Sequence, residues 1–257
     1  MRKFLLVLLA CLPLTLSAQT TDSLRVLLIG NSFTHWNKMP DMLREIVKTK
    51  KKPLEVVAMT KGGERFSGHL KNPKIVDALS NQHWDYVVLQ EQSAAPAMPT
   101  AQVIQNVYPA AKSLDSLAHV GSPNVQVIFY MTWGHKYGSF YKMDNYPISM
   151  TYEGMFERLK TSYLEMTYDN GAICAPVGMA WDRVRKEKPD WQLYKQDCFH
   201  PSELGSYLIA HVLYTTIFQQ RYQSSYNAGL PSEQAEYIQR IAQETVLNNK
   251  ELLNIVK

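Results

Sequence analysis

The sequence predicts an α/β protein: a three-layer α/β/α sandwich around a five-stranded, mostly parallel sheet. Two observations lead to this prediction. Short runs rich in aliphatic and β-branched residues alternate with longer segments of helical periodicity, which is typical of successive βαβ units. In addition, the 257 residues contain no internal repeat, low-complexity tract or linker that would divide them. A chain of this size is therefore expected to form one large domain.

Five short apolar runs are predicted to be the strands of the sheet. In order along the chain, they are Arg25–Ile29, Leu54–Met59, Asp85–Gln90, Val125–Met131 and Ala172–Pro176. The segments predicted to be helices are Met39–Thr49, Pro73–Leu79, Thr100–His119, Ser149–Tyr168, Trp181–Glu187, Pro201–Arg221 and Ser232–Asn248. In the third of these, apolar residues recur at helical spacing from Val103 to Leu117. The longest loop covers residues 132 to 147, and loops of that length are typically functional or mobile.

The first residues have the pattern of a secretory signal peptide. Arg2 and Lys3 precede an apolar run from 4 to 16, which small and polar residues follow. We therefore expect removal of residues 1–18 and export of residues 19–257, as a single domain, to the periplasm or the medium. A lipoprotein signal ending at Cys11 is a second interpretation, disfavoured because the chain stays apolar after that cysteine. No later segment is apolar over the ~20 residues that a membrane span needs.

Charge and cysteine content limit the partners that the chain can have. The formal net charge of +4 provides no footprint for nucleic acid, so we expect no nucleic-acid partner. The basic cluster formed by Lys48 and residues 50–52 lies at a predicted helix end, where solvated lysines are ordinary. An exported protein could join Cys174 to Cys198, but two separate thiols fit the sequence as well. The pairing stays open, as does the oligomeric state.

Ligands of open parallel sheets bind beyond the carboxyl ends of the strands. The residues that directly follow each predicted strand are therefore the first candidates for a functional site. After the first four strands they are Gly30-Asn31-Ser32, Thr60-Lys61-Gly62-Gly63, Glu91-Gln92-Ser93 and Thr132-Trp133-Gly134-His135.

Ser32 is the candidate nucleophile, because a Gly-Asn turn between an apolar strand and a helix would turn its hydroxyl toward the crevice. A serine nucleophile needs a base and a place for the oxyanion. Asp197 and His200, three residues apart before a predicted helix, can supply an oriented base. In a turn of this spacing the carboxylate reaches one imidazole nitrogen and leaves the other free for Ser32. Alone, Ser32 would more simply cap a turn, but together the three residues favour a serine hydrolase.

At these residues the chain resembles the SGNH/GDSL hydrolases, and more narrowly a DUF4886-like bacterial branch whose nucleophile block reads Gly-Asn-Ser-Phe. The resemblance extends from Arg25 to about Phe218 and implies a flavodoxin-like fold with Ser32, His200 and Asp197 as catalytic residues. It also implies an oxyanion hole built from the N–H groups of Ser32 and Gly63. The family's third block usually reads Gly-x-Asn-Asp, and here Gln92 takes the position of its asparagine. Such enzymes need no metal or organic cofactor, and no histidine or cysteine cluster has metal-ligand spacing.

Aromatic residues in the loops near the predicted crevice suggest the substrate. Trp36, Trp133 and Tyr137, with His135, are candidates for contacts to a sugar ring. Packing of Trp133 onto the domain is an equal alternative. Export and these aromatic residues favour hydrolysis of a carbohydrate ester, most simply an O-acetyl group on a glycan. The alternatives are a non-catalytic glycan-binding protein on the same scaffold, since fold does not fix function, and a lysophospholipase or thioesterase.

Overall fold

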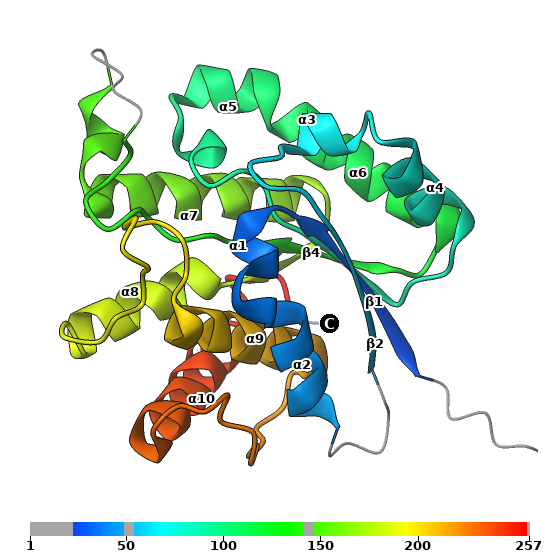
Figure 1. The fold of residues 1–257 in the computed structure, drawn as a ribbon. Helices are drawn as coiled ribbons and strands as arrows, with labels where there is room; N and C mark the ends of the chain where they lie inside the picture. The colour runs from blue at the N-terminus through cyan, green and yellow to red at the C-terminus, as the bar shows by residue number, and fades with distance from the viewer. Residues whose placement is uncertain (1–22, 49–53, 141–145, 256–257) are drawn as a thin grey trace, which may run out of the picture.

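The computed structural model describes residues 23–48, 54–140 and 146–255. Its sheet has five parallel strands in the order β2-β1-β3-β4-β5 (Figure 1). The strands are β1 (Leu24–Gly30), β2 (Leu54–Thr60), β3 (Tyr86–Leu89), β4 (Gln126–Tyr130) and β5 (Ile173–Ala175). Every predicted strand is present, and its ends differ from the prediction by at most one residue. The predicted α/β class, with a five-stranded parallel sheet, is confirmed.

Helices cover both faces of this sheet (Figure 1). On one face lie α4 (Pro73–Asn81), α6 (Tyr108–Gly121) and α7 (Tyr152–Asp169). On the other face lie α2 (Met39–Val47) and α9 (Glu203–Phe218), with α8 (Val177–Glu187) and α10 (Ser232–Leu247) packed against α9. The shorter helical segments are α1 (Ser32–His35), η1 (Trp36–Lys38), α3 (Phe66–His69), η2 (Ala95–Ala97), α5 (Thr100–Asn106) and η3 (Pro147–Met150).

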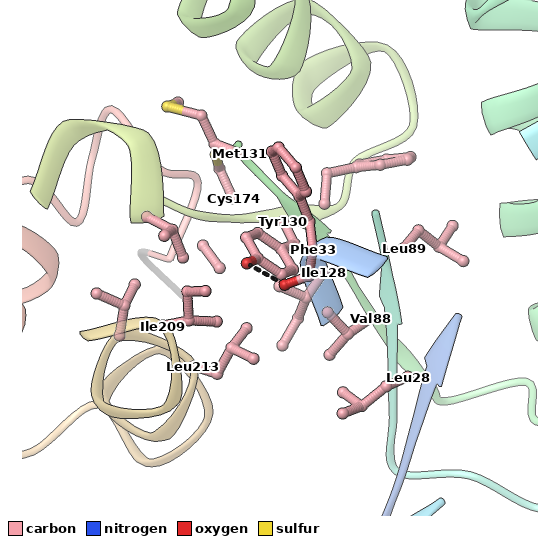
Figure 2. Close-up of a cluster of buried hydrophobic side chains, with 14 of the residues drawn as sticks. Leu28, Phe33, Val88, Leu89, Ile128, Tyr130, Met131, Cys174, Ile209 and Leu213 are labelled. Carbon is pink, nitrogen blue, oxygen red and sulfur yellow. Dashed lines mark hydrogen bonds between the residues drawn. The ribbon is translucent and has the colours of Figure 1, made fainter. Parts of the chain in front are cut away.

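The core lies between the sheet and these helices. Residues 26–29 of β1 are fully buried because helices cover both faces of the strand. Every residue of α9 from 204 to 217 is buried too, as expected for a helix that is apolar on most of its surface. Figure 2 shows Ile209 and Leu213 of α9 beside Ile128 and Val88 of the sheet. This packing holds the end of β1, and with it the residues that follow, in a rigid frame.

Several helix boundaries differ from the prediction. The predicted helix 100–119 is divided at Val107 into α5 and α6, because Pro109 has no N–H to donate and its ring collides with the preceding turn. Helix α9 begins at Glu203, since Ser202 is its N-cap and Pro201 lies outside it. Helix α8 begins four residues earlier than predicted, directly after β5. The one-turn helices were not predicted, because four residues are too few to display a period.

Some sequence-based expectations fall outside the described residues. These are the signal peptide at 1–18 with Cys11, and the lysines at 50–52. Within the described residues, Cys174 is buried in β5 and Cys198 lies in the turn before His200, and both are free thiols. No helix in the described ranges is long and apolar enough to cross a membrane.

Candidate active site

The candidate site lies at the carboxyl ends of β1 and β3, at the point where the order of the strands reverses. From β1 the chain continues to β2 on one side of it and then returns to β3 on the other. A switch point of this kind is where open parallel sheets bind ligands. Ser32 follows β1, and Gln92 follows β3. The topology therefore brings two of the predicted strand-end segments to the same place.

The turn that carries Ser32 is held by side chains on both sides. Asn31 caps α1 by accepting the N–H of Phe33 at 3.1 Å. The side-chain oxygen of Gln90, after β3, accepts the N–H of Asn31 and the hydroxyl of Thr34, both at 2.9 Å. A Cβ on Gly30 would lie 2.6 Å from that same oxygen, so a larger residue would displace the Gln90 amide from these hydrogen bonds. In addition, the Tyr130 hydroxyl donates to the carbonyl of Phe33 at 3.3 Å (Figure 2).

The turn before α9 positions the imidazole of His200. One carboxylate oxygen of Asp197 accepts the backbone N–H groups of Phe199 (3.1 Å) and His200 (3.0 Å). The left-handed conformation of Cys198, with φ of 66°, closes this turn. The other Asp197 oxygen lies 2.8 Å from Nδ1 of His200. The acid-x-x-histidine spacing thus becomes a turn in which one carboxylate holds both the backbone and the ring.

Ser32, His200 and Asp197 form a continuous line of hydrogen bonds. Nε2 of His200 lies 2.8 Å from Oγ of Ser32. Because an ionised carboxylate only accepts, Nδ1 of His200 carries a proton and Nε2 is free to accept the Ser32 hydroxyl. Burial disfavours ionisation of Asp197, but hydrogen bonds from the His200 ring and the two backbone N–H groups outweigh it and hold its pKa below the ordinary value. The geometry equips Ser32 as a nucleophile with an oriented base.

A cavity of about 230 Å³ opens beside Ser32. This serine cavity is lined by Asn31, Ser32, Phe33, Gly63, Gln92, Ser93, Phe140, Phe199 and His200. Ser32 is the first residue of α1, so its N–H has no partner within the helix, and no other acceptor for it occurs among the described residues. Gly63 has a φ of +68°, and its N–H has no acceptor among the described residues. Two residues whose backbone N–H groups lack an acceptor in the described part of the chain therefore line the cavity beside the serine hydroxyl.

The side chain of Gln92 also lines the serine cavity, and its amide has a defined orientation. Its oxygen accepts the N–H groups of Ala94 and Ala95, both at 3.0 Å. With the oxygen held in this way, the NH₂ group must lie on the other side of the amide. Its contact within the described residues is the hydroxyl of Ser93, at 3.4 Å. Gln92 can thus present a donor to the cavity, although its side chain is one methylene group longer than that of asparagine.

Glu91 was not singled out from the sequence, although it belongs to the same strand-end segment. Its side chain is buried and accepts the N–H of Gln92 at 2.6 Å and that of Phe66 at 3.1 Å. The carboxyl group therefore links the end of β3 to the loop that contains Gly63. The position of Glu91 directly after a buried strand could have marked it as a candidate. The sequence does not show, however, whether a polar side chain at such a position faces the solvent or the interior.

The aromatic candidates are placed differently from one another. Trp36 stacks on His200 with ring centroids 4.5 Å apart, so it belongs to the site. The expectation that Trp133 contacts substrate needs correction: it is fully buried between Phe33, at 4.4 Å, and Trp181, at 4.1 Å. Packing onto the domain is the correct interpretation, because flat apolar rings above and below exclude any ligand.

His135 and Tyr137 also depart from the expected substrate contacts. His135 is only 2% exposed and does not line the serine cavity. Tyr137 is 72% exposed and lines neither this cavity nor the groove described next. The two residues are close in sequence, but one side chain is buried and the other is exposed.

A second, wider groove, of about 760 Å³, has Asp197 in its wall. This lysine groove is lined by Trp36, Lys136, Gln192, Tyr194, Lys195, Gln196, Asp197 and Cys198. Nζ of Lys195 lies 4.6 Å from the ring centroid of Trp36. No group of three or more His, Cys, Asp or Glu side chains suited to a metal ion occurs in the described part of the chain.

No family model matches the chain, and neither does any curated protein. A protein from Slackia heliotrinireducens, described as a candidate SGNH hydrolase, is 32% identical, with a TM-score of 0.62 over 76% of this chain and 100% of its own.

Two further solved structures resemble the chain at lower identity. A DUF4886 family protein from Bacteroides uniformis is 17% identical, with a TM-score of 0.70 over 88% of this chain and 95% of its own. A variant acetyl xylan esterase from Geobacillus stearothermophilus is 15% identical, with a TM-score of 0.55 over 78% of this chain and 97% of its own. At such identities the likeness is one of fold alone.

Proposed function

This chain belongs to the SGNH hydrolase family, and we propose that it is an exported serine esterase that removes O-acetyl groups from a carbohydrate. The observation that carries the proposal is the line of two 2.8 Å hydrogen bonds from Asp197 through His200 to Ser32. Export is proposed from the signal-like residues 1–18.

The proposed reaction is acyl transfer in two steps. Oγ of Ser32 attacks the ester carbonyl carbon while Nε2 of His200 takes the hydroxyl proton. The tetrahedral intermediate collapses, the bond to the sugar oxygen breaks, and the sugar leaves with the proton from His200. Water then attacks the acyl-serine and gives a proton to His200. The bond between the acyl carbon and Oγ breaks, His200 returns the proton to Oγ, and acetic acid is released. Asp197 stays ionised throughout and stabilises the imidazolium, consistent with its lowered pKa.

The oxyanion of each tetrahedral intermediate is proposed to lie in the serine cavity. The N–H groups of Ser32 and Gly63 and the amide of Gln92 would donate to it. Donors that are already oriented before the reaction stabilise such charge most effectively, because they need no reorganisation. The two backbone N–H groups and the doubly anchored amide of Gln92 meet this condition.

The sizes of the two cavities support a small acyl group on a polar alcohol. The serine cavity, of about 230 Å³, is smaller than the ~300 Å³ at which ordinary ligand sites begin. The lysine groove, of about 760 Å³, combines the indole of Trp36 with amide and ammonium groups that can bind sugar hydroxyls. The same scaffold occurs in an acetyl xylan esterase, so it is compatible with this reaction.

Hydrolysis of 4-nitrophenyl acetate by the purified chain 19–257 tests the nucleophile and the base. Ser32→Ala and His200→Ala should each lower kcat by at least about 10³-fold, because the residues act as a unit. The exposed Ser113 and His83 provide matched controls, and Ser113→Ala and His83→Ala should retain full activity. Full activity in Ser32→Ala would disprove the proposed mechanism.

The acyl specificity separates the proposal from its alternatives. We expect acetyl esters to be hydrolysed faster than octanoyl esters, and acetate to be released from acetylated polysaccharide. A preference for octanoyl esters would instead favour a lysophospholipase or thioesterase. Binding to a glycan array without any hydrolysis would favour a non-catalytic glycan-binding protein.

A further inference from the structure

Ser93 and His135 form a second serine–histidine pair, which the proposed mechanism does not use. Both side chains are buried, and they follow the neighbouring strands β3 and β4. Nε2 of His135 lies 3.1 Å from Oγ of Ser93. Ser93 also lines the serine cavity together with Ser32. A buried hydroxyl is therefore anchored by His135 in a residue that shares a cavity with Ser32.

The surroundings of His135 decide which of the two groups donates. Nδ1 of His135 is buried and has no hydrogen-bond partner among the described residues. A proton on Nδ1 would leave an unpaired N–H group inside the protein, which native structures rarely tolerate, whereas an unpaired nitrogen lone pair is less unfavourable. The proton therefore lies on Nε2, and His135 donates it to Oγ of Ser93.

This arrangement excludes Ser93 as a second nucleophile. The ring of His135 packs against those of Phe140 and Phe199, with ring centroids 4.7 Å and 5.4 Å apart. Burial, with a smaller contribution from the charge of His200, lowers the pKa of His135 to about 4. Near neutral pH the ring is uncharged and weakly basic, and its Nε2 is already protonated. It cannot take a proton from Ser93.

The hydroxyl hydrogen of Ser93 must then point away from His135. Its oxygen has two lone pairs, one of which accepts from His135. The other faces the NH₂ group of Gln92, at 3.4 Å. With both lone pairs directed toward protein donors, the hydroxyl hydrogen is left free to point elsewhere, and the serine cavity that Ser93 lines offers the space for it.

We propose that Ser93 donates a hydrogen bond to the oxyanion formed at Ser32, and that His135 orients this hydroxyl as a positioning residue. The inference rests on the proposed function, because the oxyanion exists only if Ser32 attacks an ester. Ser93 adds a donor where the third block of this chain departs from the usual Gly-x-Asn-Asp. Ser93 and Gln92 together then replace the single asparagine.

Kinetics of Ser93→Ala with 4-nitrophenyl acetate test the donor. Loss of one oxyanion donor lowers kcat by about 10²-fold or more in other hydrolases. For Ser93→Ala we expect kcat to fall about 10- to 100-fold, with KM changed less than about threefold, because the bond forms mainly in the transition state. Ser113→Ala, at an exposed serine, is the matched control. An unchanged kcat in Ser93→Ala would overturn the proposal.

A double-mutant cycle tests whether His135 acts through Ser93. His135→Phe keeps a flat ring against Phe140 and removes the N–H donor. It should lower kcat less than Ser93→Ala does, and the double variant should match Ser93→Ala alone. Effects on kcat that simply multiply would show that His135 acts independently and would overturn its positioning role.

A nuclear magnetic resonance measurement keeps the proposal testable even where His135→Phe does not fold. In the intact protein labelled with ¹⁵N-histidine, His135 should carry its proton on Nε2 and stay neutral from pH 5 to pH 8. A proton on Nδ1 would overturn the orientation of Ser93.

Failure of the proposed function has a different signature. If the intact protein hydrolyses no ester, or Ser32→Ala retains full activity, the proposed function and this inference both fall. If Ser32→Ala is inactive and Ser93→Ala equals the intact protein, only the inference about Ser93 is overturned.

Discussion

At the scale of single residues, Glu91 is a buried carboxyl group that joins two loops of the candidate site. It is 1% exposed, and it accepts backbone N–H groups from Gln92 and Phe66. Burial raises the pKa of Glu91 to about 7, although these N–H groups favour the ionised form. Near neutral pH the folded protein therefore holds a proton that the unfolded chain releases at its ordinary pKa of 4.5.

The raised pKa of Glu91 predicts a pH-dependent stability. The contribution of this group to stability is complete below about pH 4.5 and is lost as the pH rises through about 7. Relative to Glu91→Gln, the free energy of unfolding of the intact protein should therefore fall between pH 5 and pH 8, by up to about 3 kcal/mol. Urea unfolding at several pH values measures the difference. Parallel pH profiles for the intact protein and Glu91→Gln would contradict this prediction. Glu251→Gln, at an exposed site, is the control, and its profile should run parallel to that of the intact protein.

At the scale of elements, the beginning of α9 supports the turn that carries His200. Ser202 is the N-cap of α9, and its hydroxyl oxygen accepts the N–H of Gly205 at 3.1 Å. The same hydroxyl donates to the carbonyl of Gln192 at 2.5 Å. Its backbone N–H donates to the carbonyl of Leu193 at 2.9 Å. This one residue thus ties the helix to the segment on the far side of the turn.

Ser202→Ala should reduce both stability and activity. Loss of an N-cap costs about 1 kcal/mol, and a frayed first turn of α9 would loosen His200, two residues earlier. We expect kcat/KM with 4-nitrophenyl acetate to fall severalfold. Asn72→Ala is the matched control, because Asn72 caps α4 by accepting the N–H of Lys74 at 3.1 Å. Equal losses of activity in the two variants, at equal losses of stability, would show that capping acts only through overall stability.

At the scale of the whole molecule, buried apolar residues from the sheet and from both helical layers form one cluster. Within the described residues it extends from Val26 in β1 to Ile255, beyond the end of α10, and includes residues of all five strands. Elements that share one core unfold together, because none can expose its apolar face without exposing that of its neighbours.

The purified chain 19–257 should therefore unfold in a single cooperative transition. Differential scanning calorimetry measures this directly, with circular dichroism at two wavelengths as an independent probe. Two resolved transitions, or probes whose midpoints differ, would contradict the prediction of a single domain.

The sequence allowed the prediction of all five strands and of the residues that follow them. Strand and helix periodicities are local, and a parallel sheet brings its carboxyl ends to one edge whatever the side chains. Ser32 was proposed from its place after the first strand, and Asp197 and His200 from their three-residue spacing before a predicted helix. Helix ends were less predictable, since the break at Pro109 and the cap at Ser202 depend on how single residues satisfy backbone hydrogen bonds.

The sequence by itself determined the fold class and the three residues of the hydrogen-bonded line, because a local pattern and one short turn specify them. Only the tertiary structure decided that Trp133 is a core residue, that Glu91 joins two loops, and that His135 meets Ser93. Each of these depends on contacts between segments far apart in the chain. A side chain in a loop has no period that says which way it points, so its direction is set by the neighbours that the fold brings to it.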